Sequence, residues 1–474
     1  MLVNRAGIWS PFGELYGEDT YTNQKELHTM ISPPTLEFPA VDNRAVSARF
    51  DGGDLTSDAG LLLLSLADKR VGLIDTMANE LVDRRQINKI RFDVKTMLRE
   101  RIFAIALGYE DCNDLDTLKE DPALRIACGK DLKSPNVLAS QPTLSRFENA
   151  VTANDLIRLG IRLAEATVAA LPKATKHVYL DIDATDDPTH GQQELSLFDG
   201  HCGTRCYLPL LAFITEDDGT QHLMGALLRS AAGRSTKGVM WMVPKAIKIL
   251  RSRFPSLQIT VRGDCGFGYG RLINWCERRE IGYLLAVQST KPMRKKALWA
   301  EMEVAVWHRS QKPGYCVYDE WMHQAGTWKQ PSRMIVKASV DGNKTEGRYV
   351  VTHTSEGTAQ EVHHAYSQRG DAENRIKEFK LDLCSGRTSC HRFLANQFRL
   401  LLHHASSILM KVLQLALSGT AYARAQVNTL RVRLLKVAAR VMETSRRVWF
   451  HLPTSFPQQH LWHTLLARLQ RAPD

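Results

Sequence analysis

The segment from residue 366 to residue 380, YSQRGDAENRIKEFK, places one carboxylate among basic and aromatic side chains. On an α-helix, where each residue turns by about 100°, a single narrow stripe carries Tyr366, Arg369, Glu373, Lys377 and Lys380. A carboxylate on such a stripe can bind a divalent cation while its basic neighbours bind phosphate oxygens. The alternative is a solvated helix face with ion pairs at i,i+4 spacing, each worth a few tenths of a kcal/mol.

Two further acidic positions end short apolar segments. Residues 177–183 alternate apolar and polar side chains up to Asp181 and Asp183, which are two residues apart and therefore on the same face of a strand. Residues 257–263 form a second segment of this kind, and Asp264 follows it directly. Two aspartates at strand ends and one glutamate on a helix suit Mg²⁺, and paired metal ions promote phosphodiester cleavage.

Alternating strands and helices are expected to position these acids. We predict strands near 177–183, 205–214, 221–229, 257–263 and 281–287, and helices near 239–252 and 269–279. Three antiparallel strands followed by parallel β-α-β units describe an α/β fold with a mixed sheet. In that layout the strands that lead to Asp183 and Asp264 are neighbours, and their C-terminal ends meet at one crevice.

Residues 288–355 interrupt this pattern with β-like runs at 314–321, 333–340 and 347–353. The interruption begins with basic residues and contains four tryptophans: Trp299, Trp307, Trp321 and Trp328. Basic residues interleaved with tryptophan suit an unpaired or distorted nucleic acid strand, because bases stack on indole rings. Packing in the core of a small β subdomain is the alternative for each of them.

The first 45 residues lack apolar periodicity, whereas residues 46–172 are predicted to be helical. Ser140 followed by Pro142 predicts a helix start, and the helix that follows presents Arg146. We expect this side chain to contact a DNA groove or backbone, although a surface helix in a bundle would have the same pattern.

The positive charge is concentrated in the C-terminal region. The whole chain has 474 residues and a net charge of +11, and residues 385–474 hold 13 Lys and Arg against 2 acidic residues. We predict helices over 391–417 and 428–448, the second of which carries Arg431, Arg433, Lys436 and Arg440. Such a surface favours a polyanionic partner.

Size and composition indicate a soluble protein of two or three domains, with 44% hydrophobic and 24% charged residues. The N-terminal region has no apolar stretch typical of a secretory signal, and no apolar run is long enough to span a bilayer. The nine cysteines are scattered and odd in number, which suits a reducing cytoplasm.

These motifs resemble those of DDE transposases of bacterial insertion sequences. Tyr366, Arg369, Glu373 and Lys380 match the tyrosine-arginine-glutamate-lysine signature of the insertion-sequence-four group and its relatives. The segments 181–194, DIDATDDPTHGQQE, and 140–149, SQPTLSRFEN, resemble motifs of the related family numbered thirteen-eighty. The resemblance spans about residues 47 to 450.

The resemblance implies an RNase H-like catalytic core over 173–384, interrupted by a β-rich insertion at 288–355. This core is flanked by a poorly structured extension (1–45), a helical DNA-binding region (46–172) and a basic helical region (385–474). By matching position, Asp183, Asp264 and Glu373 would be catalytic and bind metal, while Tyr366, Arg369 and Lys380 would bind phosphates beside the scissile bond. Asp181 is the alternative to Asp183, and the sequence leaves that choice open.

We therefore expect a cut-and-paste transposase. It would use two Mg²⁺ ions, with Mn²⁺ as the alternative, to cleave DNA at terminal inverted repeats and to join the freed 3′-OH ends to target DNA. Its partners would be double-stranded DNA and, in the DNA complex, a second copy of the chain. It would work in the bacterial cytoplasm, associated with the nucleoid when bound to DNA. A catalytically inactive end-binding repressor and a nuclease of the same fold without strand transfer are the alternatives.

Overall fold

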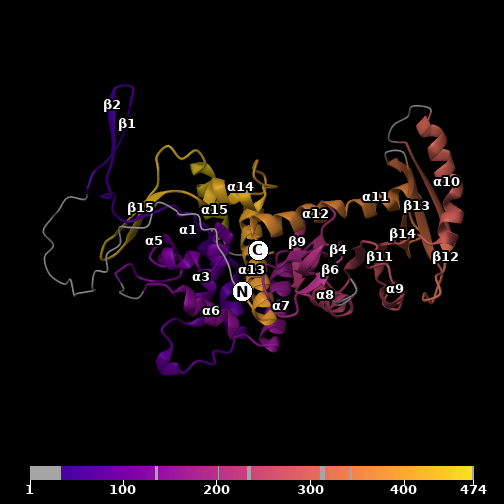
Figure 1. Cartoon of the computed structure of the whole chain (residues 1–474), viewed down its shortest axis with the longest axis horizontal. Helices are drawn as coiled ribbons and strands as arrows, with labels where there is room; N and C mark the ends of the chain where they lie inside the picture. Colours follow the sequence, from indigo (N-terminus) through magenta and orange to yellow (C-terminus); the bar gives the residue numbers. More distant parts are fainter. Residues whose placement is uncertain are drawn as a thin grey trace, which may run out of the picture. The chain divides into compact units, whose positions relative to one another are not determined.

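The computed structural model describes residues 34–133, 137–200, 202–231, 236, 238–309, 315–341 and 344–471 (Figure 1). The chain divides into two compact units, residues 1–53 and 54–474. In the first unit, β1 (Leu36–Val41) and β2 (Arg44–Ala48) form an antiparallel hairpin. Asp42 and Asn43 make the turn with positive φ angles of 47° and 61°, as two-residue hairpin turns require. The hairpin corrects the prediction of little regular structure for residues 36–45, and residues 1–33 lie outside the described part of the chain.

The second unit contains a mixed sheet of eight described strands in the order β12-β13-β14-β11-β10-β4-β8-β9. The strands that the sequence predicted outside the insertion are β4 (His177–Ala184), β8 (Leu210–Thr215), β9 (Gln221–Leu227), β10 (Gln258–Gly263) and β11 (Gly282–Val287). As predicted, β9, β8 and β4 are antiparallel, and β4, β10 and β11 are parallel. The predicted strand at 205–214 is divided, because β7 (Thr204–Tyr207) joins a separate small sheet with β5 (Asp187–Pro188) and β6 (Leu197–Asp199).

The interruption at 288–355 is β-rich as predicted, but it continues the central sheet. After α10 (Lys291–Arg309), its strands are β12 (Cys316–His323), β13 (Ser332–Asp341) and β14 (Lys344–Thr352). β14 pairs with β11 in an antiparallel register. Ile335, Val350 and Val351 are fully buried, so these strands have apolar contacts on both faces and pack as an extension of the core.

The two faces of the sheet have different roles. Along β4, Val178, Leu180 and Ile182 belong to the apolar core that also includes residues of α8 (Val239–Arg253) and α9 (Gly270–Glu277). Side chains alternate along a strand, so Asp181 and Asp183 face the other way. On that side lie α11 (Ala359–Ser367) and α12 (Gly370–Lys377).

The N-terminal region is helical as predicted. Its described helices are α1 (Leu61–Val71), α2 (Leu73–Glu80), α3 (Val94–Leu107), α4 (Asp114–Leu118), α5 (Pro122–Ala127), α6 (Gln141–Asn149) and α7 (Ala153–Ala169). α13 (Phe393–Ala416), which confirms the predicted helix at 391–417, packs against α3, α7 and β9. One apolar core therefore joins the N-terminal helices, α13 and the β9 side of the sheet (Figure 1). Across the described residues, no helix has the length and apolar composition needed to cross a membrane.

The predicted helix at 428–448 is wrong. It is present only as α14 (Val427–Leu430) and a π-helical turn η3 (Arg431–Leu435). The chain then forms β15 (Ala439–Glu443) and β16 (Val448–His451), which make a three-stranded sheet with β3 (Leu55–Thr56), and ends its described part with α15 (Gln459–Gln470). The β-branched and aromatic residues of 441–450 favour strands, and the distant β3 supplies the backbone partners.

Candidate active site

The C-terminal ends of β4 and β10 bring two of the predicted acids together. The parallel register pairs Arg262 with Asp181 and Gly263 with Ile182, so Asp264 follows directly beside Asp183. Because side chains alternate along both strands, Asp183 and Asp264 lie on the face that α11 and α12 cover. The sequence predicted this adjacency, and the structure has it.

Asp183 is a buried carboxylate held by a cation. Its Oδ2 accepts a hydrogen bond from Arg369 Nη1 at 2.7 Å, and its Oδ1 accepts one from the backbone N–H of Ala184 at 2.8 Å. Burial raises the pKa of Asp183 to about 6, the charge of Arg369 opposes this shift, and the charge of Asp264 adds to it. Asp183 therefore needs a positive group nearby in order to stay ionised.

Glu373 approaches the same cation from α12. Its Oε1 lies 3.5 Å from Arg369 Nη2, and its side chain is 56% exposed. Burial acts to lower the pKa of the Arg369 guanidinium, but the charges of Asp183, Tyr366 and Asp264 raise it overall. The three acids predicted to be catalytic thus surround or adjoin one guanidinium.

The donor chemistry of these residues fits a divalent cation. All three predicted ligands offer carboxylate oxygens, which hard cations prefer, and Asp183 is already paired with a positive charge. Within the described ranges, however, no group of three His, Cys, Asp or Glu side chains is arranged to hold a metal ion. The Arg369 guanidinium lies between Asp183 and Glu373. It occupies the position that a metal ion would need in order to bind both carboxylates.

Asp181 has a structural environment. Arg262 Nε and Nη2 donate to its two carboxylate oxygens at 2.6 and 2.8 Å, and Thr215 Oγ1 donates to Oδ2. Asp181 and Arg262 are both almost completely buried. Arg262 also stacks on the ring of Tyr179 and donates to the carbonyl of Ala365 in α11. Asp181 therefore links the sheet to α11. Both of its carboxylate oxygens already accept hydrogen bonds from Arg262 or Thr215.

The segment that carries the predicted stripe is a broken helix. A capping box of Thr358 and Glu361 is present at the start of α11. The helix is interrupted around Arg369, continues as α12, and ends in a π-helical turn η2 (Glu378–Asp382). In η2, Lys380 Nζ donates to the carbonyl and to Oδ1 of Asp186 at 2.7 and 3.0 Å. The break directs Arg369 at the sheet, whereas Lys377 stays exposed.

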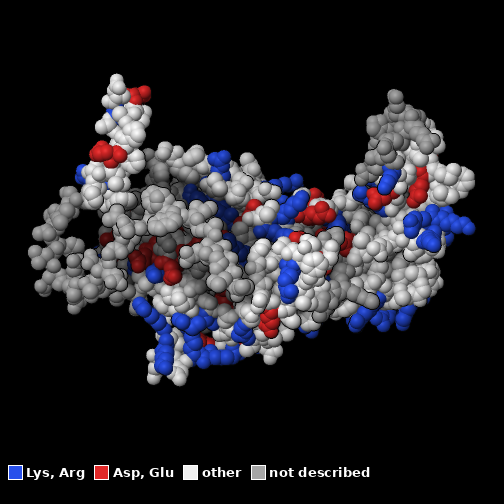
Figure 2. Space-filling view, viewed as in Figure 1, with Lys and Arg blue, Asp and Glu red and all other residues white. Residues whose placement is uncertain are grey.

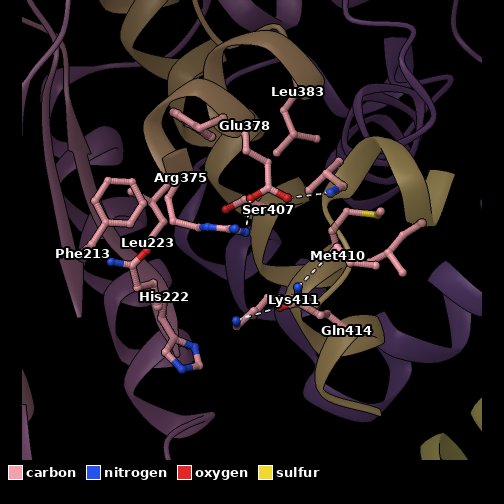
Figure 3. Close-up of a pocket in the computed structure, with 15 residues that line it drawn as sticks. Phe213, His222, Leu223, Arg375, Glu378, Leu383, Ser407, Met410, Lys411 and Gln414 are labelled. Carbon is pink, nitrogen blue, oxygen red and sulfur yellow. Dashed lines mark hydrogen bonds and ion pairs between the residues drawn. The ribbon is translucent and has the colours of Figure 1, made fainter. Parts of the chain in front are cut away.

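Figure 3 shows the contacts that hold the C-terminal end of this helical segment. Glu378 forms an ion pair with Arg375, and its Oε1 accepts a hydrogen bond from the backbone of Val427 at 2.6 Å. Lys411 of α13 lines the same small cavity of about 70 Å³ and donates to Gln414 at 2.8 Å. Burial lowers the pKa of Lys411 to about 8. These contacts fix the end of α12 to the C-terminal helices, and thereby the helix that carries Glu373.

Sequence reasoning missed two buried ionisable groups, one near Asp264 and one near Lys380. Arg229, just after β9, is buried; burial lowers its pKa to about 10 and the charge of Asp264 acts in the opposite direction. Asp187 is buried and accepts a hydrogen bond from Thr388 Oγ1 at 2.9 Å, and burial raises its pKa to about 7. A single basic residue after a strand does not indicate burial, so the sequence offered no reason to select Arg229. Asp187 follows Asp186 in a segment that resembles a turn, where an aspartate is expected to be a turn former.

The predicted DNA contacts outside the stripe have different surroundings. Arg146 in α6 and two residues of the C-terminal region, Arg433 and Arg440, are exposed. Lys436 donates to Asp58 at 2.8 Å and lies over the Tyr109 ring. Arg431 corrects its prediction, because it is buried and its guanidinium donates to the carbonyls of residues 106 and 382.

The four tryptophans of the interruption differ in exposure. Trp328 is buried with 7% exposed surface, and Trp321 is partly buried against the same core. Trp299 on α10 is 77% exposed and Trp307 is 38% exposed. Trp299 is therefore the tryptophan of this group with the most surface available to a base.

Comparisons with known proteins give one family match. The model of the family described as Transposase DDE domain group 1 matches residues 38–474. No curated protein sequence matches the chain. Among solved structures, the chain is similar to a piggyBac transposase synaptic complex with hairpin DNA, at a TM-score of 0.44 and 12% identity over 80% of this chain and 79% of that one.

Proposed function

The chain belongs to the family Transposase DDE domain group 1 and is a DNA-cleaving transposase, and from this premise we propose that it acts on an insertion sequence. It cleaves phosphodiester bonds at the terminal inverted repeats and joins the freed 3′-OH ends to target DNA. The observation that carries this proposal is the pairing of parallel β4 and β10, which brings Asp183 beside Asp264, with Glu373 linked to Asp183 through Arg369.

The catalytic core is RNase H-like in this proposal, of the group related to the family numbered thirteen-eighty. The order of antiparallel β9, β8 and β4 followed by parallel β10 and β11 supports it, as do acids at the ends of the two central strands. The interruption at 288–355 lies between Asp264 and Glu373 in sequence, as the resemblance implies, and extends the sheet at its far edge.

Asp183, Asp264 and Glu373 are the proposed catalytic acids, and they would hold two Mg²⁺ ions, with Mn²⁺ as the alternative. Bound there, such ions supply charge stabilisation for the attacking and leaving oxygens of the displacement. Asp183 is preferred to Asp181, because Arg262 and Thr215 already use both oxygens of Asp181.

The basic residues of the broken helix hold the DNA backbone. Arg369, once it leaves Asp183, and Lys380 donate to phosphate oxygens beside the scissile bond, and the exposed Lys377 binds a phosphate farther along. Tyr366, which the sequence predicted to bind a phosphate, packs its ring in the apolar cluster under α11, and in this proposal it orients the neighbouring Arg369.

Double-stranded DNA at the element ends and in the target is the proposed partner. Arg146 contacts it from the N-terminal region, and Arg433, Lys436 and Arg440 contact it from the C-terminal region. Two copies of the chain bring two ends together as a homodimer in the bacterial cytoplasm, at the nucleoid when bound to DNA. Binding weakens steeply with salt, because each neutralised phosphate releases counterions.

The ion pair between Arg369 and Asp183 favours one rival. A chain whose acids stay neutralised by Arg369 would bind DNA ends without cleaving them. A nuclease that cleaves without joining is the other rival, and one assay separates all three.

The assay combines labelled element ends with a supercoiled target plasmid and Mg²⁺. Wild-type protein is expected to cleave the ends and to join them to the plasmid. Glu373→Gln is expected to lose both products and to keep end binding, because it changes one carboxylate oxygen and no buried contact. Asp371→Asn is the matched control, an exposed acid on the same helix, and should retain both products.

The outcomes are distinct. Binding without products by wild-type protein supports the end-binding rival, and cleavage without joining supports the nuclease. Equal activity of Glu373→Gln and Asp371→Asn would remove Glu373 from the proposed site.

A further inference from the structure

A basic loop connects α2 to α3 in the N-terminal helical region. From residue 81 to residue 95 the chain holds five basic side chains, Arg84, Arg85, Lys89, Arg91 and Lys95, against two acidic ones, Asp83 and Asp93. Neither the stripe of the active site nor the C-terminal region includes these residues. Their charge favours a polyanion.

The base of this loop is fixed. Arg85 donates to both carboxylate oxygens of Asp83 at 2.8 and 2.6 Å and to the carbonyl of Phe92 at 2.8 Å. Phe92 is buried, and Arg84 forms an ion pair at 2.9 Å with Asp155 in α7. The two ends of the loop are therefore clamped to each other and to the helical body, so the tip is held in one place.

The tip presents an unusual combination of side chains. Ile87, in the 3₁₀ turn η1 (Ile87–Lys89), is 85% exposed, and its neighbours Gln86 and Asn88 are also exposed. An isoleucine left in water gains none of the burial energy that stabilises apolar side chains in a core. Lys89 has no ion-pair partner among the residues that the structure describes, and Arg91 stacks on the Phe92 ring.

A groove lies between this loop and α6. A cavity of about 510 Å³ has the loop residues Arg84, Arg85 and Lys89 on one wall and Thr143 and Arg146 of α6 on the other. Figure 2 shows lysine and arginine side chains gathered in the area that lies below the label α6 in Figure 1. Arg84 and Arg85 already pair with Asp155 and Asp83, so Lys89 on one wall and Arg146 on the other carry the positive charge most available to a phosphate backbone.

We propose that the loop at 81–93 enters the minor groove of duplex DNA, with Ile87 as a wedge between base pairs. Gln86 and Asn88 face the base edges, Lys89 and Arg91 bind the flanking phosphates, and Arg146 binds a phosphate across the groove. Proteins that bend DNA from the minor groove combine these elements, an apolar wedge with Asn, Gln, Arg and Lys beside it. The proposal rests on the proposed function, since it assumes that the chain binds DNA ends.

The test uses the full-length protein and two fluorescent duplexes of equal length, one with an element end and one unrelated. Binding is measured by anisotropy over a salt series, and bending by energy transfer between the duplex ends. The variants are Lys89→Ala/Arg91→Ala, which removes phosphate contacts, and Ile87→Ser, which removes the wedge. Lys248→Ala/Arg251→Ala, two exposed charges on α8, is the matched control, and thermal melting checks that each variant folds.

Lys89→Ala/Arg91→Ala should lower the slope of log K against log salt by about 2 on both duplexes, close to 0.9 per phosphate contact. Ile87→Ser should keep the slope, lose the bend and bind the end duplex about tenfold more weakly, a loss of about 1.4 kcal/mol. Wild-type protein should protect adenine N3, which lies in the minor groove, from methylation by dimethyl sulfate, and Ile87→Ser should not.

Three results would overturn the proposal: an unchanged slope in the loop variant, an equal loss in the α8 control, or protection of guanine N7 alone. If wild-type protein neither binds nor cleaves the end duplex, the proposed function fails instead. If it does both and the loop variants behave like wild type, only the present inference fails.

Discussion

Two aspartates that lie two residues apart on one strand have different environments in the structure. Asp181 and Asp183 share a strand and a face, but Arg262 neutralises the first deep in the sheet, whereas Arg369 reaches the second from a helix break. The first pair is almost completely buried, and the second is 12–13% exposed at the edge. We interpret Asp181 as structural and Asp183 as the proposed catalytic acid.

Substituting each aspartate separates these roles. Asp181→Asn leaves the buried Arg262 without a charge partner and should lower the free energy of unfolding by about 3–5 kcal/mol. Asp183→Asn removes a carboxylate whose pKa is raised to about 6, so it should cost less than about 1 kcal/mol near neutral pH and abolish cleavage. Denaturant unfolding and the end-cleavage assay measure both effects. Cleavage that survives in Asp183→Asn would return Asp181 to consideration.

Arg369 occupies the position that a cation between Asp183 and Glu373 would need. Arg369→Ala should therefore destabilise the metal-free protein by about 3 kcal/mol, because it leaves a buried carboxylate alone. The same variant should bind Mg²⁺ about tenfold more tightly, since a competing charge is gone. Thermal melting of DNA-free protein over a Mg²⁺ series gives the affinity. Arg369→Lys retains a charge and serves as the control, and an identical response of both variants would contradict this role.

At the scale of elements, the placement of the chain's basic residues depends on where helices stop. The turn η3 ends α14 and directs Arg431 inward, where it donates to the carbonyls of Ala106 and Asp382. Gly108, with a φ of +92°, has no Cβ; one built there would lie 3.3 Å from Arg431 Nε. Arg433, two residues later, stays exposed. A strictly helical interpretation of 428–448 would have placed both on the DNA surface.

The pair Arg431 and Arg433 tests this difference. Arg431→Ala should lower the free energy of unfolding by about 2–3 kcal/mol, because two buried carbonyls lose their donors, and should leave the salt dependence of DNA binding unchanged. Arg433→Ala should leave stability unchanged and lower the salt slope by about 0.9. If Arg433→Ala lowered stability and Arg431→Ala lowered the salt slope, the inward placement of Arg431 would be contradicted.

Across the second unit, several buried carboxyl groups have raised pKa values. Glu100 in α3 is one of them: burial raises its pKa to about 8, while the backbone N–H of Ala139 and the charge of Arg101 oppose this shift. Asp187 and Asp183 follow, at about 7 and about 6. These groups bind protons more tightly in the folded than in the unfolded chain.

The contribution of Glu100 to folding stability should therefore fall as pH rises from about 4.5 to 8, because this side chain binds its proton more tightly in the folded chain. Buried histidines such as His403 and His404, whose pKa values burial lowers, act in the opposite direction at acidic pH, so the test compares a Glu100 variant with the wild type. Glu100→Gln, neutral at every pH, should flatten this dependence and raise the melting temperature most at pH 8. Thermal melts across this range check it, with Glu165→Gln as the control, a partly exposed acid of α7 that pairs with Arg162 on the surface. A difference in melting temperature between Glu100→Gln and wild-type protein that does not grow with pH would contradict the assignment.

Much of this protein follows from local patterns. Period-two alternation located β4 and β10, the order of strands and helices predicted their parallel pairing, and the spacing of Tyr366, Arg369, Glu373 and Lys380 identified the helix that carries the third acid. These features depend on neighbours within a few residues or on general rules of chain connection.

The tertiary structure decided what local patterns could not. Arg262 and Arg369 distinguish Asp181 from Asp183, β3 converts a predicted helix into strands, and β14 joins the interruption to the central sheet. In each case the deciding partner is dozens to hundreds of residues away, so the energy of the contact is absent from the local sequence. Burial and pairing are properties of the folded chain, and they determine which charges remain available for chemistry.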